Sequence, residues 1–118
     1  MNRTSELQTL TPLEFHIMLA VLRRPQYGYA IKQQIALDSV MRVHPTTGTL
    51  YPALRRLTKQ GWLEETEPAG YYRLSSLGEQ MLRFETDRLT ETVRRAETRF
   101  TARKYGLNER HLLGDEAA

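Results

Sequence analysis

The last third of the chain carries a repeat of side chains that strongly restricts how it can fold. Seven positions recur at alternating spacings of four and three: Leu82, Thr86, Leu89, Val93, Ala96, Phe100 and Arg103. This heptad spacing places one stripe of side chains along a helix, and helices with such a stripe pair with one another. A helix over residues 76–104 would have about seven turns. A helix of that length projects beyond a small domain, so its stripe must be covered by something.

We therefore expect residues 76–104 to form a C-terminal dimerisation helix. The predicted dimer interface consists of the apolar members of the stripe: Leu82, Leu89, Val93, Ala96 and Phe100. The alternative is that the stripe packs within the monomer, against the first helix. The arginines of this segment are expected to face solvent or to pair within the helix.

Length and composition exclude several classes of protein. The 118 residues suffice for one domain of ordinary size. The absence of cysteine excludes a disulfide scaffold, a thiolate zinc site and a cysteine nucleophile. The longest apolar run, Ile17 to Leu22, is far shorter than the ~20 residues that span a bilayer, and no apolar signal-peptide core follows Met1. We expect a cytoplasmic protein without a membrane segment.

Two helices are predicted before residue 40. Thr11 to Glu14 is typical of a capped helix start, with Pro12 at the first helical position, and Arg23 to Pro25 end this helix. A second helix is expected over Tyr29–Leu37, with a buried side formed by Ala30, Ile31, Ile35 and Leu37. The connection after it is expected to pack three apolar side chains onto the core: Val40, Met41 and Val43.

A third helix is predicted to begin within Thr46–Thr49 and to end near Gln60, followed by Gly61 as a left-handed cap. One face of this helix is apolar, with Leu50, Leu54 and Leu57 at helical spacing. Pro52 would fall in or next to the first turn, where a missing N–H costs little.

A short hairpin and the long helix complete the prediction. Trp62–Thr66 and Tyr71–Leu74 are expected to form two strands, and Ser75 or Ser76 to cap the last helix. The order predicts a mainly α fold with a small β-hairpin, a winged helix-turn-helix followed by the long helix. We expect a DNA-binding domain over residues 1–75, the dimerisation helix over 76–104 and a flexible tail over 105–118.

The third helix is the candidate for DNA recognition, because such a helix lies in the major groove in winged helix-turn-helix proteins. With its leucines facing inward, a helical wheel turns five residues outward: Gly48, Pro52, Arg55, Arg56 and Lys59. Thr49 and Tyr51 lie on the flanks. This face is basic, free of acids and small at its N-terminal end, where a phosphate can approach. The alternative is an ordinary solvated helix surface.

Three motifs are similar to those of PadR-family transcriptional regulators. Residues 10–22 and 27–31 resemble the family's opening, residues 48–57 with 61–63 resemble its signature GTLYPALxRLxxxGL, and residues 71–78 resemble YYRLTxxG. The resemblance implies a dimeric repressor that binds a palindromic operator, with some members responding to small molecules. It matches Gly48, Thr49, Tyr51, Pro52 and Arg55 to the recognition helix. It also matches Tyr72 and Arg73 to the wing.

The wing departs from the family pattern. Where many relatives carry basic residues before the Tyr-Tyr pair, this chain has Glu64, Glu65 and Glu67. An acidic wing is a poor phosphate ligand, so the expected binding energy shifts onto the third helix. A winged-helix module that binds protein without DNA is the alternative that this wing favours.

No catalytic or metal site is predicted. His16, His44 and His111 are scattered and lie beside no acid or second histidine in a ligand pattern. The chain has no Gly-rich phosphate loop and no hydrolase-like carboxylate pair, so we expect no enzyme and no cofactor. Trp62 is expected to anchor the core or the base of the wing, with an effector pocket as the alternative.

Overall fold

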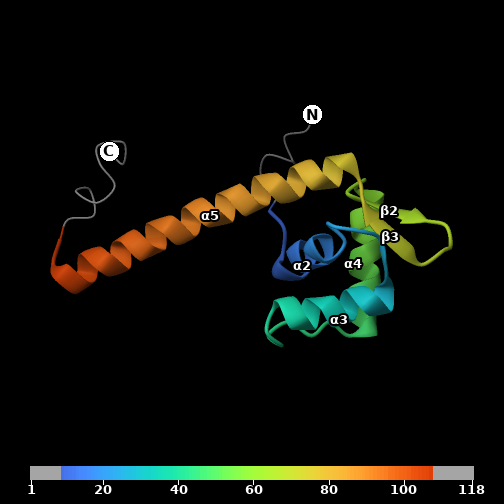
Figure 1. Ribbon diagram of the computed structural model, residues 1–118, viewed down its shortest axis with the longest axis horizontal. Coiled ribbons are helices and arrows are strands. Elements are labelled where there is room, and N and C mark those ends of the chain that lie inside the picture. Colours follow the sequence, from blue (N-terminus) through green and yellow to red (C-terminus); the bar gives the residue numbers. More distant parts are fainter. Residues whose placement is uncertain (1–8, 108–118) are drawn as a thin grey trace. The chain divides into compact units, whose positions relative to one another are not determined.

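The computed structural model describes residues 9–107. In chain order it contains α2 (Pro12–Ala20), β1 (Gln26–Tyr27), α3 (Gly28–Asp38), α4 (Thr47–Lys59), β2 (Leu63–Thr66), β3 (Tyr71–Leu74) and α5 (Ser76–Tyr105) (Figure 1). The predicted fold class is confirmed: three helices precede a wing and a long helix. The chain divides into two compact units, residues 1–85 and 86–118, which are described separately.

The start of α2 has the predicted capping box. The Glu14 backbone N–H donates to Thr11 Oγ1 at 3.1 Å, and the Thr11 N–H donates to Glu14 Oε1 at 3.0 Å. The helix ends at Ala20, earlier than expected, because Val21 leaves the helical conformation. Ile17 and Met18 are fully buried. Every side chain from Leu13 to Ala20 is buried or half-buried, so the helix packs on more than one side.

The segment after α3 departs from the prediction. Ile31 and Ile35 are buried as expected, but Leu37 is 71% exposed. Val40 is 79% exposed, and Met41 is also exposed. Both take left-handed backbone angles, φ 53° and 64°, and the Met41 N–H closes the helix end on the Ala36 carbonyl at 2.7 Å. This turn directs both side chains outward, so only Val43 of the connection packs against the core.

Helix α4 begins and ends as the sequence predicts. Thr46 caps it by accepting the Thr49 N–H at 3.2 Å. Gly61 follows it with φ 83°, and the Trp62 N–H donates back to the Leu57 carbonyl at 3.0 Å, which is a Schellman closure. The inward residues Leu50, Ala53, Leu54 and Leu57 are buried in the core.

Pro52 lies deeper in α4 than expected. The helix begins at Thr47, so Pro52 belongs to its second turn and removes the hydrogen bond that the Gly48 carbonyl would accept. Gly48 is exposed, so water can reach that carbonyl. The proline is tolerated because the lost partner lies on the outer surface.

The sheet has one more strand than the predicted hairpin. The two-residue β1 pairs with β3, giving the antiparallel order β1-β3-β2. Ser75 links the sheet to α5: its hydroxyl accepts the Gly78 N–H at 2.9 Å and donates to the Gly61 carbonyl at 2.6 Å. Gly78 lies against the Trp62 carbonyl so closely that no side chain would fit. Trp62 is buried, as predicted for a core anchor.

Helix α5 changes its environment along its length. Leu82, in the first unit, is 3% exposed and belongs to the core cluster. The prediction of Leu82 as an interface residue is therefore wrong. In the second unit, Leu89, Val93 and Phe100 are 36%, 57% and 68% exposed. Of the predicted tail, residues 108–118 lie outside the described part. Among the described helices, none is long and apolar enough to cross a membrane.

Candidate nucleic-acid interface

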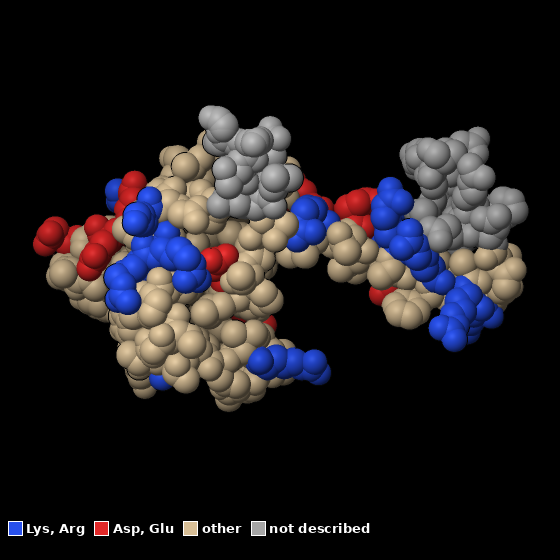
Figure 2. Space-filling model, turned by 180° about the vertical axis from the view of Figure 1, so that it is seen from behind, with Lys and Arg blue, Asp and Glu red and all other residues tan. Residues whose placement is uncertain are grey.

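The outward side of α4 is a basic surface without acids. Gly48, Arg55 and Lys59 are exposed, Pro52 is half-buried, and the four lie on the side opposite the buried leucines. Within the described residues, neither Arg55 nor Lys59 makes a hydrogen bond or ion pair, so both cations can meet an outside anion. Figure 2 shows Lys and Arg side chains gathered on the first unit beside Asp and Glu side chains. We call Gly48, Pro52, Arg55 and Lys59 the α4 outer face.

Thr49 has a structural role that the sequence reasoning missed. Its hydroxyl accepts the Thr46 N–H at 3.0 Å and donates to the Thr46 carbonyl at 3.1 Å. Together with the Thr46 cap, these bonds form a capping box made of two threonines. The hydroxyl is thus occupied at the helix start, although Thr49 is exposed, like Thr47 on the other side of Gly48. A threonine three residues after the N-cap was the signal in the sequence.

Tyr51 fixes α4 against α3. Its ring lies over Gly28, where an added Cβ would come within 2.6 Å of the Tyr51 hydroxyl oxygen. A side chain at residue 28 would therefore displace the Tyr51 ring from this position. Tyr51 is half-buried, so it borders the α4 outer face and does not stand free on it.

Arg56 is directed away from the predicted outward position. Its Nε donates to Glu14 Oε2 at 3.0 Å, and the Glu14 side chain is largely buried. The angular position of Arg56 on the flank of α4 allows it to reach α2, 42 residues earlier in the chain. The ion pair joins α2 to α4 and compensates the Arg56 charge. Arg56 is therefore a flank residue that holds the helix in place.

Tyr72 is buried beneath the interface and does not point out of it. Its ring belongs to the core cluster. Burial raises the pKa of Tyr72; Glu65 and Tyr51 raise this pKa further, and Arg55 opposes them. Tyr72, predicted to contact DNA from the wing, is therefore a packing residue of the core.

Arg73 lies on the opposite face of the sheet from Tyr72, because successive strand residues alternate. It is paired across the strands with Glu64, whose Oε1 accepts from Arg73 Nε at 2.8 Å. Both side chains are about half exposed. Arg73 is thus separated from the α4 outer face and already has an anionic partner.

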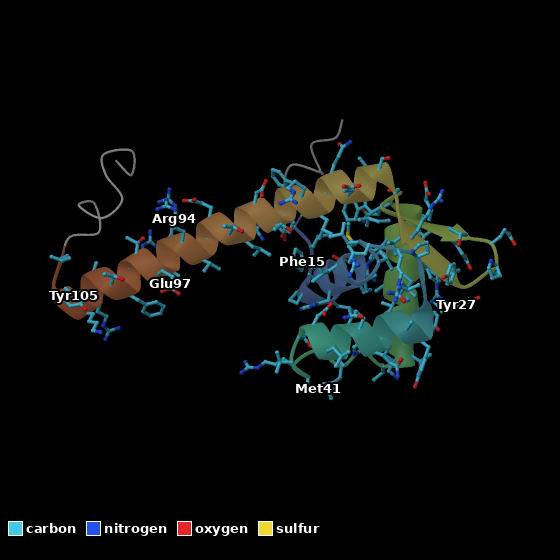
Figure 3. The ribbon with its side chains drawn as sticks, viewed as in Figure 1. Phe15, Tyr27, Met41, Arg94, Glu97 and Tyr105 are labelled. Atoms are coloured by element: carbon cyan, nitrogen blue, oxygen red, sulfur yellow. The ribbon has the colours of Figure 1, made fainter. Side chains whose placement is uncertain are left out.

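Two exposed tyrosines border the interface and were not predicted. Tyr27 is stacked on Tyr71 with ring centroids 4.3 Å apart, and Tyr29 is exposed in the first turn of α3. Figure 3 shows Tyr27 at the start of α3. Tyr29 follows Gly28, which Tyr51 of α4 contacts, so Tyr29 extends the candidate surface onto α3. The Tyr27–Tyr71 pair lies on the Arg73 side of the sheet. The Tyr-Gly-Tyr sequence was the available signal.

The second unit presents the stripe predicted for self-association. Its members Leu89, Val93, Ala96 and Phe100 are exposed. On its flank, Glu91 pairs with Arg94 at 2.8 Å and with Arg95 at 3.1 Å. The hydrogen bond from Arg94 is the main reason that the pKa of Glu91 is lowered. These arginines pair within the helix, as predicted.

The structure gives little support to an effector pocket at Trp62 or to a metal site. A cleft of about 410 Å³ lies between α2, β1 and α3, with Arg23 and Arg24 in its lining, and Trp62 does not line it. His16 Nδ1 is buried and has no hydrogen-bond partner in the described part of the chain. Within residues 9–107, no group of three or more His, Asp or Glu side chains could hold a metal ion.

Solved structures share this fold. A PadR-like transcription factor from Bacteroides fragilis is 34% identical, with a TM-score of 0.55, over 70% of this chain and 86% of that one. A protein from Streptococcus mutans is 27% identical, with a TM-score of 0.64, over 81% and 94%. A transcriptional regulator from Clostridium thermocellum is 24% identical, with a TM-score of 0.60, over 67% and 83%, and shows the fold alone. No curated protein matches the chain.

The winged-helix fold with its basic third helix defines a DNA-binding class of protein. The model of the PadR-like transcriptional regulator family matches residues 18–84. The chain belongs to this family, as the sequence motifs predict, and is a DNA-binding transcriptional regulator.

Proposed function

We propose that this protein is a homodimeric repressor that binds a palindromic operator through the α4 outer face. The observation that carries the proposal is the pair of cations Arg55 and Lys59, exposed on a helix face without acids. Both can bind phosphate oxygens, and arginine can also donate to guanine O6 and N7. Gly48 and Pro52 allow the backbone at the start of α4 to approach the DNA closely.

Residues around this face hold the reading helix in place. Arg56 is tied to Glu14 of α2 at 3.0 Å, and Tyr51 rests on Gly28 of α3. The α4 helix therefore has a supporting contact on each flank. We assign Arg55 and Lys59 to DNA contact, and Arg56 and Tyr51 chiefly to orientation of the helix.

The dimer is proposed from the exposed stripe in the second unit. Leu89, Val93 and Phe100 are apolar and exposed at heptad spacing, and a second copy would cover them. A two-fold dimer presents two identical reading helices, which requires two inverted half-sites about 34 Å apart. Repression and a small-molecule effector are implied by the family resemblance. The cleft beside Arg23 and Arg24 has a volume that suits a small ligand.

Binding to a random duplex at two salt concentrations tests DNA binding without knowledge of the operator. With about four phosphate contacts per dimer, affinity should fall about 100-fold between 50 and 200 mM salt. The alternative function is a protein-binding winged helix, favoured by the acidic wing. That alternative predicts weak binding to duplex DNA with no such decline.

A further inference from the structure

The wing carries neighbouring acids on opposite faces of one strand. Glu64 and Glu65 are consecutive in β2, so their side chains point to opposite sides of the sheet. Glu64 is opposite Arg73, and Glu65 is opposite Tyr72 in the strand register. Tyr72 packs on the core side of the sheet. Glu65 therefore lies on the side that faces α4, and Glu64 lies on the other side.

Glu65 is restrained at the turn of the wing. Its Oε2 accepts the Gly70 N–H at 2.6 Å, which closes the wing turn and restricts the carboxylate. Glu65 raises the pKa of Tyr72 and Arg55 lowers it, so both charges act on the same hydroxyl. They form no ion pair with each other among the described residues. Arg55 is thus available to DNA, and Glu65 lies on the side of the sheet that faces α4.

We propose that Glu65 restrains DNA binding: a carboxylate built into the edge of the interface lowers the affinity for every DNA sequence. The inference rests on the proposed function, in which Arg55 meets the phosphate backbone. A phosphate that approaches Arg55 also approaches Glu65, and like charges repel. The penalty applies to the backbone and not to the bases. It therefore limits occupancy of unrelated sites, where phosphate contacts supply nearly all of the affinity.

The strand supplies a matched control for this proposal. Glu64→Gln and Glu65→Gln remove the same charge from adjacent positions of β2, on opposite faces. Glu64→Gln also releases Arg73 from its pair, which makes the control demanding. A glutamine at residue 65 keeps an oxygen that can accept the Gly70 N–H, so the wing turn is preserved.

The experiment is a fluorescence anisotropy titration of each full-length variant with a random 20-bp duplex at low and high salt. Glu65→Gln should bind about three- to tenfold more tightly per bound protomer at 50 mM salt, with the gain shrinking as salt screens the charges. Glu64→Gln should change affinity less than about twofold, because screening weakens a more distant charge. Partial unfolding cannot imitate a gain in affinity.

The outcomes separate the two proposals. Equal gains for both variants would mean that net charge alone matters, and an unchanged affinity for Glu65→Gln would mean that its carboxylate lies away from the DNA; either result overturns the inference while the proposed function stands. If the unsubstituted protein binds duplex DNA without salt dependence, the proposed function fails and this inference fails with it.

Discussion

Helix α4 and the second-unit part of α5 are both amphipathic helices, yet their apolar sides have different fates. In α4, Leu50, Leu54 and Leu57 are buried within the first unit. In α5, Leu89 and Val93 are exposed in the second unit. The same helical periodicity therefore serves two purposes. The apolar side of α4 fixes the helix in its own domain and leaves its polar side for the proposed DNA contact. The apolar side of α5 stays exposed in the second unit, where we propose that a second copy of the chain covers it.

The largest effect is expected when charged residues are introduced into the exposed stripe of α5, because they should disrupt the proposed dimer. Leu89→Asp with Val93→Asp would bury carboxylates from both protomers in the proposed seam, at a cost of several kcal/mol per ion. Light scattering should report a monomer at micromolar concentration. Thr98→Asp with Thr101→Asp adds the same charge on the side of α5 away from the stripe and should leave the dimer intact. A seam variant that stays dimeric would place the interface elsewhere.

Truncation of a side chain on the buried side of α4 should have the next largest effect, on the free energy of unfolding. Leu54→Ala removes a fully buried side chain and should lower the free energy of unfolding by about 2–5 kcal/mol. Leu37→Ala makes the same chemical change on an exposed side chain and should stay within about 0.5 kcal/mol. Urea unfolding measures both. Similar losses for the two variants would show that burial does not distinguish these sites.

Local signals predicted the helix starts and the fold well. The caps at Thr11 and Thr46 depend on residues three positions away. The end of α4 depends on the ability of Gly61 to take a positive φ. These features are readable because the interacting residues are close in sequence. The heptad stripe was likewise visible in the sequence, but the sequence did not show which of its residues pack within the monomer. Leu82 has the spacing of the stripe, and its side chain nevertheless packs in the core of the first unit.

The candidate site was predicted in part, and the errors at Arg56 and Arg73 have different causes. Arg56 was assigned outward, but Glu14 draws it to α2. Arg73 was assigned to DNA, but the strand alternation turns it away and Glu64 pairs with it. The helical wheel gives only a residue's direction from its own helix, and a long side chain is placed by partners far along the chain. Strand β1 escaped prediction because two residues carry no periodicity.

The central claim is that the α4 outer face binds DNA, and one paired measurement tests it most directly. Operator affinity and its salt dependence are measured for Arg55→Ala and Arg73→Ala, which remove one arginine from α4 and one from the far face of the sheet. Arg55→Ala should lose about 1–3 kcal/mol of binding free energy. If Arg55 contacts a phosphate, the salt slope should also fall by about one. Arg73→Ala should bind like the unsubstituted protein. Unchanged operator affinity for Arg55→Ala, or an equal loss for Arg73→Ala, would contradict the account.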